Sequence, residues 1–465
     1  MRIPVIWTIV AAVVGVIAVI FVGSLLIQPD LPLVVEAGFD REGITPNADG
    51  DNDIATFSYE LTRNARVSIL LEDAGGQIYA FRDAQQRIAQ KYNVQFSGVV
   101  DGYVLPGEQL GGTVMQRLIP DGNYTWRLRA DAPDGETQEV SGTLSIRDAD
   151  VPLPDITTFT ISPSTFTPNQ DGRADRVAIN VYVAKPDADV RVVLLGEENS
   201  EIPISARKEG NINEDAQRYI FDYAGGVDLN ADPPPDGTYE VVVTAQDEEG
   251  QIVRASSELT IRDGGKPFAE IVAQSTGVDV AFVAVPYDER FFSDASGLGD
   301  LVEIPEDGDI LAQQAITMNV GDMLVFKLTV ENYSDVPIRT TWPLPGTVYQ
   351  QDQLAAAMGR NESSGAWRVG IECESSTNTY PYRWAIGGDD VLVTETGQTG
   401  EVFKYLPANS RSTVWGAIRF TDLNENFNPQ TCYAGLIHED VAVSERNSRV
   451  GPVEIELVDP NAGEE

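Results

Sequence analysis

Three observations predict an all-β protein in which a transmembrane helix precedes three β-sandwich domains. The first is an uncharged apolar run near the N-terminus, Pro4 to Ile27. The second is a series of short segments that alternate apolar and polar residues, separated by Asp-Gly, Gly-Gly and Pro-Asp-Gly turns. The third is an internal duplication. A chain of 465 residues is long enough for about three domains of ordinary size.

Residues 1–30 are expected to form a cytoplasmic stub and a signal-anchor transmembrane helix. No charge lies between Arg2 and Asp30, and the run from Pro4 to Ile27 exceeds the roughly 20 residues that span a bilayer. A signal peptide usually has an apolar core of about 7–15 residues, which favours a retained anchor. Arg2 indicates a cytoplasmic N-terminus and an extracytoplasmic remainder, because positive residues favour the cytoplasmic side. The alternative is a cleaved signal, which exports the same domains without a tether.

The charge balance limits the kinds of partner. Seventy-two acidic residues face thirty-two basic ones, for a net charge of −40. Nucleic acids and anionic lipid surfaces are bound by clustered Lys and Arg, and no such cluster occurs in the sequence. We therefore expect no nucleic-acid partner. The remaining composition, 42% hydrophobic and 22% charged, is that of folded globular domains.

Residues 31–150 and 151–265 are two copies of one unit, because several landmarks recur in the same order at nearly constant offset. Each copy consists of short alternating segments, with a helical turn expected only near Arg82–Lys91. This pattern, over roughly 115 residues, is typical of an Ig-like sandwich. The landmarks are Thr45–Gly50 and Thr167–Gly172 (TPN-x-DG), Asp121–Tyr124 and Asp236–Tyr239 (Asp-Gly-x-Tyr), and Ile146–Asp148 and Ile261–Asp263 (Ile-Arg-Asp).

Both copies resemble the FlgD-type Ig-like repeat of flagellar hook-capping proteins, bacterial surface proteins and secreted proteases. The order of TPN-x-DG, strands and PDG-x-Y carries the resemblance, and Phe221–Val243, FDYAGGVDLNADPPPDGTYEVVV, matches it best. The first copy departs from the pattern by a longer insertion between Phe96 and Asp121. The resemblance covers about half of the chain. It implies an Ig-like fold but no definite function, because the family serves as a spacer, adhesion or capping module in unrelated proteins. It does not suggest a hook role, since hook caps are not membrane-anchored.

Residues 266–458 do not continue the repeat and are predicted to form a third β-sandwich, followed by an acidic tail at 459–465. Alternating segments such as DMLVFKLTVENY and STVWGAIRF support this prediction. Both cysteines of the chain, Cys373 and Cys432, lie in this region. In an exported protein such a pair is expected to form a disulfide, and two free buried thiols are the alternative.

The first TPN-x-DG stretch contains a candidate calcium loop. Oxygen-bearing side chains occupy alternate positions around Gly50, and calcium takes six to eight oxygen ligands. The alternative is a turn that begins a strand, because Asn and Asp side chains hydrogen-bond nearby backbone amides. The second copy favours the turn, since Arg173 replaces one ligand there. The candidate ligands are Asn47, Asp49, Asp51 and Asp53.

A second candidate site is aromatic. Tyr380, Tyr382 and Trp384 alternate in TYPYRWAIG and would share one face of a strand. Exposed rings on such a face stack on sugars, which predicts ligand binding. The alternative is that the three rings pack in the core, since aromatic side chains bury a large area.

Signals for catalysis are scarce, and we expect no enzymatic activity. The single histidine, His438, excludes an HExxH metal site, and no G-x-S-x-G, P-loop or G-x-G-x-x-G motif occurs. A Ser-His-Asp site would need His438, which we expect to be solvated at the start of a strand.

The sequence therefore predicts a membrane-anchored extracytoplasmic scaffold or adhesion-type protein. Its Ig-like repeats would act as a spacer, and the third sandwich would present a surface to a cell-envelope protein or polysaccharide. The alternative is a cell-surface carbohydrate-binding module that uses the exposed aromatic residues. The scaffold predicts that these rings are buried, whereas the module predicts rings exposed in a groove. A hydrolase with paired carboxylates is a third hypothesis.

Overall fold

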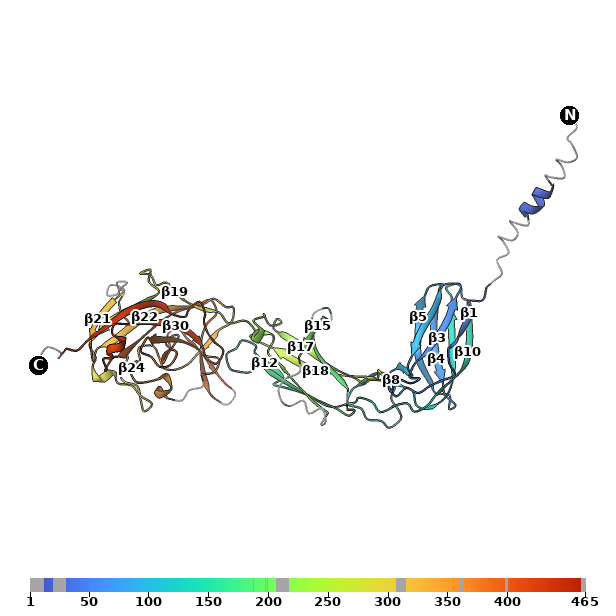
Figure 1. Ribbon diagram of the computed structural model, residues 1–465, viewed down its shortest axis with the longest axis horizontal. Helices are drawn as coiled ribbons and strands as arrows, with labels where there is room; N and C mark the ends of the chain where they lie inside the picture. The colour runs from blue at the N-terminus through green and yellow to red at the C-terminus, as the bar shows by residue number, and fades with distance from the viewer. Residues whose placement is uncertain are drawn as a thin grey trace, which may run out of the picture.

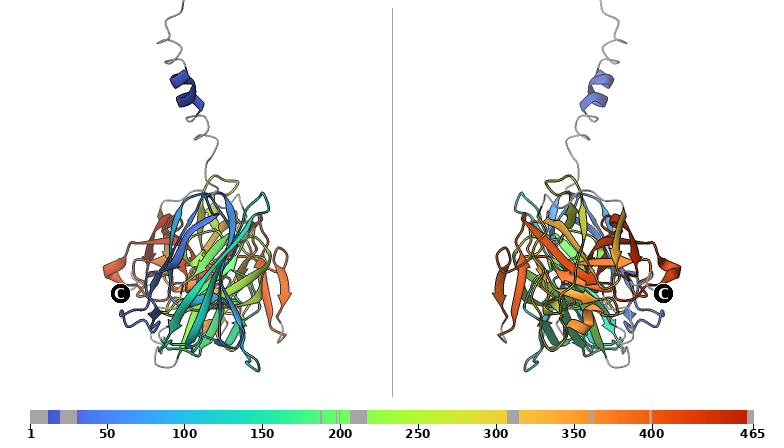
Figure 2. Two further views of the ribbon diagram at one scale, coloured as in Figure 1. Left: turned by 90° about the vertical axis from the view of Figure 1, so that its right-hand side faces the viewer. Right: turned by 90° about the vertical axis from the view of Figure 1, so that its left-hand side faces the viewer.

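The computed structural model describes residues 12–19, 31–186, 188–196, 198, 200–205, 217–306, 315–359, 363–397 and 400–460. Three β-rich units follow one another along the chain (Figure 1). Viewed along the long axis they overlap, so they lie in a row (Figure 2). We call them the first repeat (31–150), the second repeat (151–265) and the third sandwich (266–458).

Most of the predicted transmembrane segment lies outside the described residues. Residues 12–19 are helical, and the rest of the run from Pro4 to Ile27 is not described. Among the described residues, no helix is long and apolar enough to cross a membrane. Residues 461–465 of the predicted acidic tail also lie outside the described part.

The first repeat is a sandwich of two sheets around one core. Strand β3 alternates buried and half-buried side chains, as the period of two in a strand requires. The helical turn expected near Arg82–Lys91 is wrong, because this segment belongs to β5 and to the start of β6. One sheet orders β1 (Val34–Phe39), β3 (Ala55–Leu61) and β6 (Lys91–Phe96), and the other orders β2 (Gly43–Ile44), β10 (Thr137–Ile146), β9 (Gly122–Asp131), β4 (Ala65–Glu72) and β5 (Ile78–Arg87).

The second repeat has the same strand order, as the internal duplication predicts. The short strand β12 runs parallel to β18, as β2 runs parallel to β10 in the first repeat. One sheet orders β11 (Ile156–Ser162), β13 (Val177–Val183) and β16 (Arg218–Tyr223), and the other contains β15 (Glu201–Ile204), β14 (Asp189–Leu195), β17 (Gly237–Gln246), β18 (Ile252–Ile261) and β12 (Thr165–Phe166).

The insertion of the first repeat crosses into the second. It forms a hairpin of β7 (Val99–Asp101) and β8 (Thr113–Leu118), and β8 pairs antiparallel with β18. Val114 on β8 is buried in the core of the second repeat. The boundary at residue 150 therefore separates the two repeats in sequence, but the larger sheet of the second repeat includes strands from both.

The third sandwich packs a five-stranded sheet against a larger sheet. Short 3-10 turns lie in its loops, η4 (Glu289–Phe291), η5 (Ala355–Met358) and η6 (Glu425–Phe427), whereas η3 (Val227–Leu229) belongs to the second repeat. The first sheet contains β19 (Ala269–Val272), β20 (Val280–Val285), β22 (Met323–Asn332), β29 (Arg411–Arg419) and β24 (Val348–Gln350). The second contains β21 (Ala315–Asn319), β32 (Val450–Val458), β30 (Gln430–His438), β25 (Trp367–Cys373), β23 (Ile338–Thr340), β28 (Val402–Leu406), β27 (Val393–Thr396), β26 (Tyr382–Ala385) and β31 (Ala442–Val443).

The two cysteines form a disulfide inside the third sandwich, in agreement with the pairing favoured from the sequence. Cys373 on β25 lies directly opposite Cys432 on β30, and both side chains are buried. The bond therefore joins two neighbouring strands in the middle of the larger sheet.

Candidate functional site at the junction of the second repeat and the third sandwich

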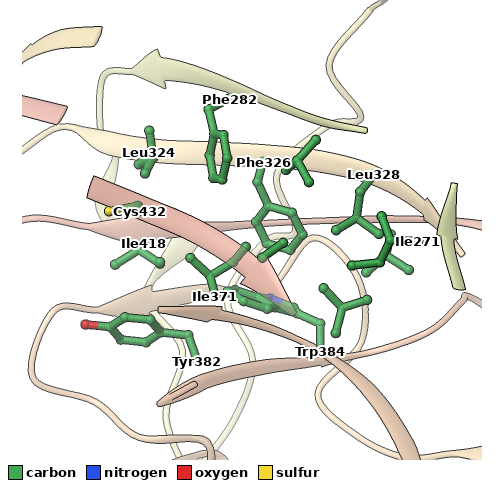
Figure 3. Close-up of a cluster of buried hydrophobic side chains, with 14 of the residues drawn as sticks. Ile271, Phe282, Leu324, Phe326, Leu328, Ile371, Tyr382, Trp384, Ile418 and Cys432 are labelled. Carbon is green, nitrogen blue, oxygen red and sulfur yellow. The ribbon is translucent and has the colours of Figure 1, made fainter. Parts of the chain in front are cut away.

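The three aromatic candidates are not exposed. Tyr380, Tyr382 and Trp384 have relative exposures of 3%, 5% and 0%, and the last two lie among other hydrophobic side chains (Figure 3). The Tyr382 hydroxyl donates to the Gln351 carbonyl at 2.6 Å, and the Trp384 ring N–H donates to the Thr347 carbonyl at 2.9 Å. The expectation of exposed, sugar-stacking rings is therefore wrong. The rings are buried because both faces of this part of the chain are covered.

The candidate calcium residues form a self-contained turn, which we call the first Asp loop (Asn47–Asp53). One carboxylate oxygen of Asp53 accepts hydrogen bonds from the amides of Asn47 and Ala48, and the other accepts from Gly50 at 2.8 Å. Asp49 accepts from the amide of Asp51 at 2.8 Å. These oxygens point at the loop's own backbone. Within the described residues, no group of three or more His, Cys, Asp or Glu side chains is placed to hold a metal ion.

The second Asp loop (Asn169–Asp175) has similar internal bonds in a different environment. Asp175 accepts from the amides of Asn169, Asp171 and Gly172, and Asp171 accepts from the amide of Arg173 at 2.8 Å. Here Asn169 and Asp171 are buried, at 5% and 6% exposure. These two residues are buried because the loop is docked against the third sandwich, whereas most residues of its twin face solvent.

Side chains from two strands of the third sandwich hold Asp171. The Arg339 guanidinium on β23 donates to the Asp171 carbonyl at 2.6 Å, and the Tyr405 hydroxyl on β28 donates to the Asp171 carboxylate at 2.8 Å. Arg173 donates to the same Tyr405 oxygen at 2.8 Å and stacks its guanidinium 3.8 Å from the centre of the Phe403 ring. Arg173, whose presence argues against calcium in the second copy, is thus a contact between two domains.

Two glycines let the backbones meet. Gly172 and Gly365 have φ angles of +82° and +76°, in the left-handed region that glycine favours. A Cβ atom on Gly172 would lie 2.0 Å from the Ser364 carbonyl oxygen, and one on Gly365 would lie 2.2 Å from the Gly172 nitrogen. Gly50, the counterpart of Gly172 in the first loop, has a similar φ but open space around it. The two Asp loops thus form the same kind of turn, but only the second is docked against the third sandwich.

Burial perturbs the acids of the docked loop. Burial raises the pKa of Asp171, although the hydrogen bond from Tyr405 and the amide of Arg173 oppose the rise. Burial also raises the pKa of Asp175 to about 6, and the Asp171 carboxylate adds to that rise. The docked loop therefore holds its carboxylates at some electrostatic cost.

His438, at the end of β30, lies in the same interface. Its ring is 5% exposed, so the expectation of a solvated histidine is wrong. The ring stacks on Trp367 at 4.5 Å, and Nε2 lies 2.7 Å from the Gln170 carbonyl. The pKa of His438 is lowered to about 4, mainly by burial and to a smaller extent by Arg339, whereas backbone hydrogen bonds with Gln170 and Gly365 oppose the shift. At neutral pH the ring is therefore uncharged, and Nε2 donates to the Gln170 carbonyl.

Glu439, the acid next to His438, does not form a catalytic pair with it. Glu439 is buried and accepts from Arg368 at 2.5 Å and from Arg383 at 2.6 Å. This carboxylate is thus committed to two arginines of the third sandwich.

A cavity of about 470 Å³ lies beside the docked loop. The second repeat supplies Gly172 and Arg173, and the third sandwich supplies the other walls. Three of the lining residues are basic and one is acidic. The residues from the third sandwich are Arg339, Thr340, Thr341, Trp342, Leu344, Ala385, Leu392, Glu401, Val402, Phe403 and Lys404.

The junction between the two repeats is also tightly bonded. Gln251 is fully buried, and its side chain accepts from the Leu118 amide at 3.2 Å and donates to the Pro152 carbonyl at 2.9 Å. Lys185 bridges the repeats and binds three carboxylates at 2.7–2.9 Å. These carboxylates belong to Asp150, Asp247 and Glu249.

Sequence reasoning missed Arg339, Tyr405 and His438 as contact residues. The available signals were indirect: Arg173 in place of an acid in the second loop, and the longer insertion in the first repeat. Neither signal shows which surface the second Asp loop or the insertion of the first repeat contacts.

Comparison with known proteins leaves the family open. No protein-family model and no curated protein matches the chain. Among solved structures, a 1.5-MDa bacterial ice-binding adhesin is 10% identical over 92% of this chain and 98% of that chain, with a TM-score of 0.18. A Ca²⁺-stabilised adhesin of an Antarctic bacterium is 11% identical over 91% and 100%, with a TM-score of 0.18. A two-domain fibronectin type III segment of chicken tenascin is 11% identical over 48% and 97%, with a TM-score of 0.15. Such scores carry no argument, so the description of this fold rests on its own strands and cores.

Proposed function

We propose that this protein is a non-enzymatic extracytoplasmic scaffold of the adhesion type. Its two FlgD-type Ig-like repeats act as a stiff spacer, and the third sandwich presents the surface that meets a cell-envelope protein or polysaccharide. The observation that carries the proposal is the bonding at both junctions, which fixes each unit on the next.

Linked domains ordinarily move relative to one another unless the interface between them is extensive. Here the first junction shares a sheet through β8 and β18, and Gln251 is fully buried within it. The second junction buries Asn169 and Asp171 against Arg339 and Tyr405. Both features restrict bending, which suits a spacer that holds a terminal domain at a set distance and orientation.

The proposal places the anchor in the apolar run at the N-terminus, Pro4 to Ile27. A signal-anchor there would attach the first repeat to a membrane and leave the third sandwich farthest from it. The net charge of −40 supports a solvated position outside the cell, because like charges keep such a chain soluble and apart from anionic surfaces.

The buried rings give the carbohydrate-binding alternative no support at Tyr380–Trp384. The proposal likewise assigns no catalytic residue, since His438 and Glu439 are both engaged within the fold.

Distances between spin labels test the stiffness of the second junction. Labels replace Ser257 on β18 and Glu454 on β32, which are both exposed and lie in different units. The full chain should give one narrow distance distribution. A variant with Gly365→Ala, in which the new Cβ would collide with the Gly172 backbone, should broaden it. A broad distribution in the unmodified chain would contradict the spacer.

A further inference from the structure

Four loops form the end of the first repeat at which the chain enters it, and we call this end the entry face. Strand pairing places the loops together: β3 starts and ends level with its neighbours β1 and β6, and β4 does so with β5 and β9. In Figure 1 the entry face lies at the top of the first repeat, and the hairpin of β7 and β8 lies at the other end. The loops are 31–33, 62–64, 88–90 and 132–136.

Two exposed aliphatic side chains belong to the entry face. Leu31 is 58% exposed and Ile88 is 61% exposed. They precede β1 and β6, which flank β3 on its two sides in the smaller sheet. Single exposed aliphatic residues are ordinary on a protein surface, so exposure alone does not indicate a partner. The position of these two beside the apolar run of the chain does indicate one.

The apolar run and the entry face are separated by very little chain. The run ends at Ile27, and only Gln28, Pro29 and Asp30 stand between it and Leu31. This connection covers at most about 14 Å when fully extended. The headgroup layer on one side of a bilayer is roughly 5–7 Å thick. If Ile27 lies at the edge of the hydrocarbon, Leu31 therefore lies less than about 10 Å beyond the headgroups.

The charges of the entry face indicate which lipids it can contact. Its loops carry one basic residue, Arg63, and two acids, Asp134 and Glu136. Arg63 pairs with both acids, at 3.2 Å and 2.5 Å. Asp30 adds one more acid just before the face. A slightly acidic face gains nothing from anionic lipids, so its exposed aliphatic side chains suit a zwitterionic headgroup layer.

We propose that the entry face rests on the membrane surface, with Leu31 and Ile88 inserted among zwitterionic lipid headgroups. The inference rests on the proposed function, because the contact exists only where the apolar run spans a bilayer. A short tether alone would let the first repeat swivel on the membrane. The contact fixes the angle of the first repeat, and the two bonded junctions pass this angle on to the third sandwich.

Fluorophores on single cysteines test the contact, because both native cysteines are bound in the disulfide. The full chain is reconstituted in phosphatidylcholine vesicles that contain a lipid with a nitroxide on its headgroup, which quenches nearby fluorophores. The label replaces Ile88 (Ile88→Cys) or, as the matched control, Ile78 (Ile78→Cys). Ile78 is 53% exposed and begins β5, about 30 Å from Ile88. We expect severalfold stronger quenching at Ile88 than at Ile78. Equal quenching at the two positions, or none at either, would overturn the inference.

Serine variants show whether the aliphatic side chain makes the contact. The fluorophore now replaces Pro133 (Pro133→Cys), an exposed residue of the 132–136 loop. Ile88→Ser should shift the equilibrium about 4- to 12-fold toward a released face, as expected for losing half of the burial of an isoleucine, and so lower the quenching. Ile78→Ser should leave the quenching unchanged. Unchanged quenching in Ile88→Ser would refute a contact made by this side chain.

Flotation of the vesicles in alkaline carbonate separates this inference from the proposed anchor. A chain that floats with the vesicles and is quenched mainly at Ile88 supports both. A chain that floats without preferential quenching at Ile88 would refute the entry-face contact and leave the anchor intact. A chain that does not float would refute the anchor and the contact that depends on it.

Discussion

Replacing Tyr405 by phenylalanine removes a single hydroxyl from the second junction. That hydroxyl donates to the Asp171 carboxylate and accepts from Arg173, both at 2.8 Å, and the side chain is only 2% exposed. The ring itself stays, so the packing is preserved. A hydrogen bond to a charged, buried group contributes about 1.5–3 kcal/mol. Docking of the second Asp loop should therefore weaken roughly 10- to 150-fold.

Hydrogen exchange at individual amides measures this loss, because exchange reports the free energy of local opening. The amides of Gly172 and Arg173 bond to carboxylates of their own loop, which Arg339 and Tyr405 hold against the third sandwich. They should exchange about 10- to 150-fold faster in the Tyr405→Phe variant.

The first Asp loop provides the control within the same molecule. The amides of Gly50 and Asp51 make the matching internal bonds without a covering domain, so their exchange should not change. Unchanged exchange at Gly172 and Arg173 would mean that the docked contact does not stabilise the loop, which would refute the reasoning.

Three further predictions address the glycines, the first junction and pH. Gly50→Ala should lower the free energy of unfolding by about 1 kcal/mol because of the positive φ at this position. Gly172→Ala should have the same cost and also undock the second Asp loop, which thermal unfolding and hydrogen exchange would detect. Equal effects of the two variants would contradict the docking. Lys185→Met leaves three carboxylates without their cation and should lower the free energy of unfolding of the repeats by about 3 kcal/mol, measured with denaturant. A loss below about 1 kcal/mol would show that this ion-pair cluster is dispensable. Acidification has opposing effects at the second junction. The pKa of His438 is lowered to about 4, so its contribution to the stability of docking is present above about pH 6.5 and is lost as the pH falls toward 4. The pKa of Asp175 is raised to about 6, so protonation of this carboxylate stabilises the docked state as the pH falls through 6. In the His438→Gln variant only the effect of Asp175 remains, so docking should tighten between pH 6 and pH 4, as measured by the distances between spin labels. Looser docking over that range would contradict the predicted pH dependence.

The repeats could be predicted from sequence because their landmarks are local. Thr45–Gly50 and Thr167–Gly172 mark the same turn at a readable offset, and strands such as β3 follow a period of two. The chemistry of the loop could also be anticipated, since Asn and Asp side chains bond to amides close in sequence.

What the sequence could not show is which copy is covered. Asp171 meets Tyr405 across 234 residues, and Gln170 meets His438 across 268. Contacts at such separations depend on how whole units pack, and a single sequence has no local pattern that records them. The Asp loops therefore look alike in sequence, although one faces solvent and the other is docked against the third sandwich.

The aromatic segment failed for a related reason. Alternation in Tyr380, Tyr382 and Trp384 shows that the rings share a face, but does not show what lies against that face. β26 pairs with β25 beside the main path of the larger sheet, and other parts of the sandwich cover its rings. The periodicity of a strand shows to which face its side chains point, but their burial depends on neighbours that are distant in the chain.

The hairpin that the first repeat places against β18 has a consequence for how the chain is made. The first repeat leaves the ribosome before the second, so β7 and β8 are available as a template when β18 is synthesised. The two repeats then complete each other and should unfold as one cooperative block rather than as independent beads. A second repeat produced without β8 would leave Ile252–Arg254 of β18 with an open edge, which is a hazard for aggregation. The extra hairpin thus joins two similar modules through one shared sheet.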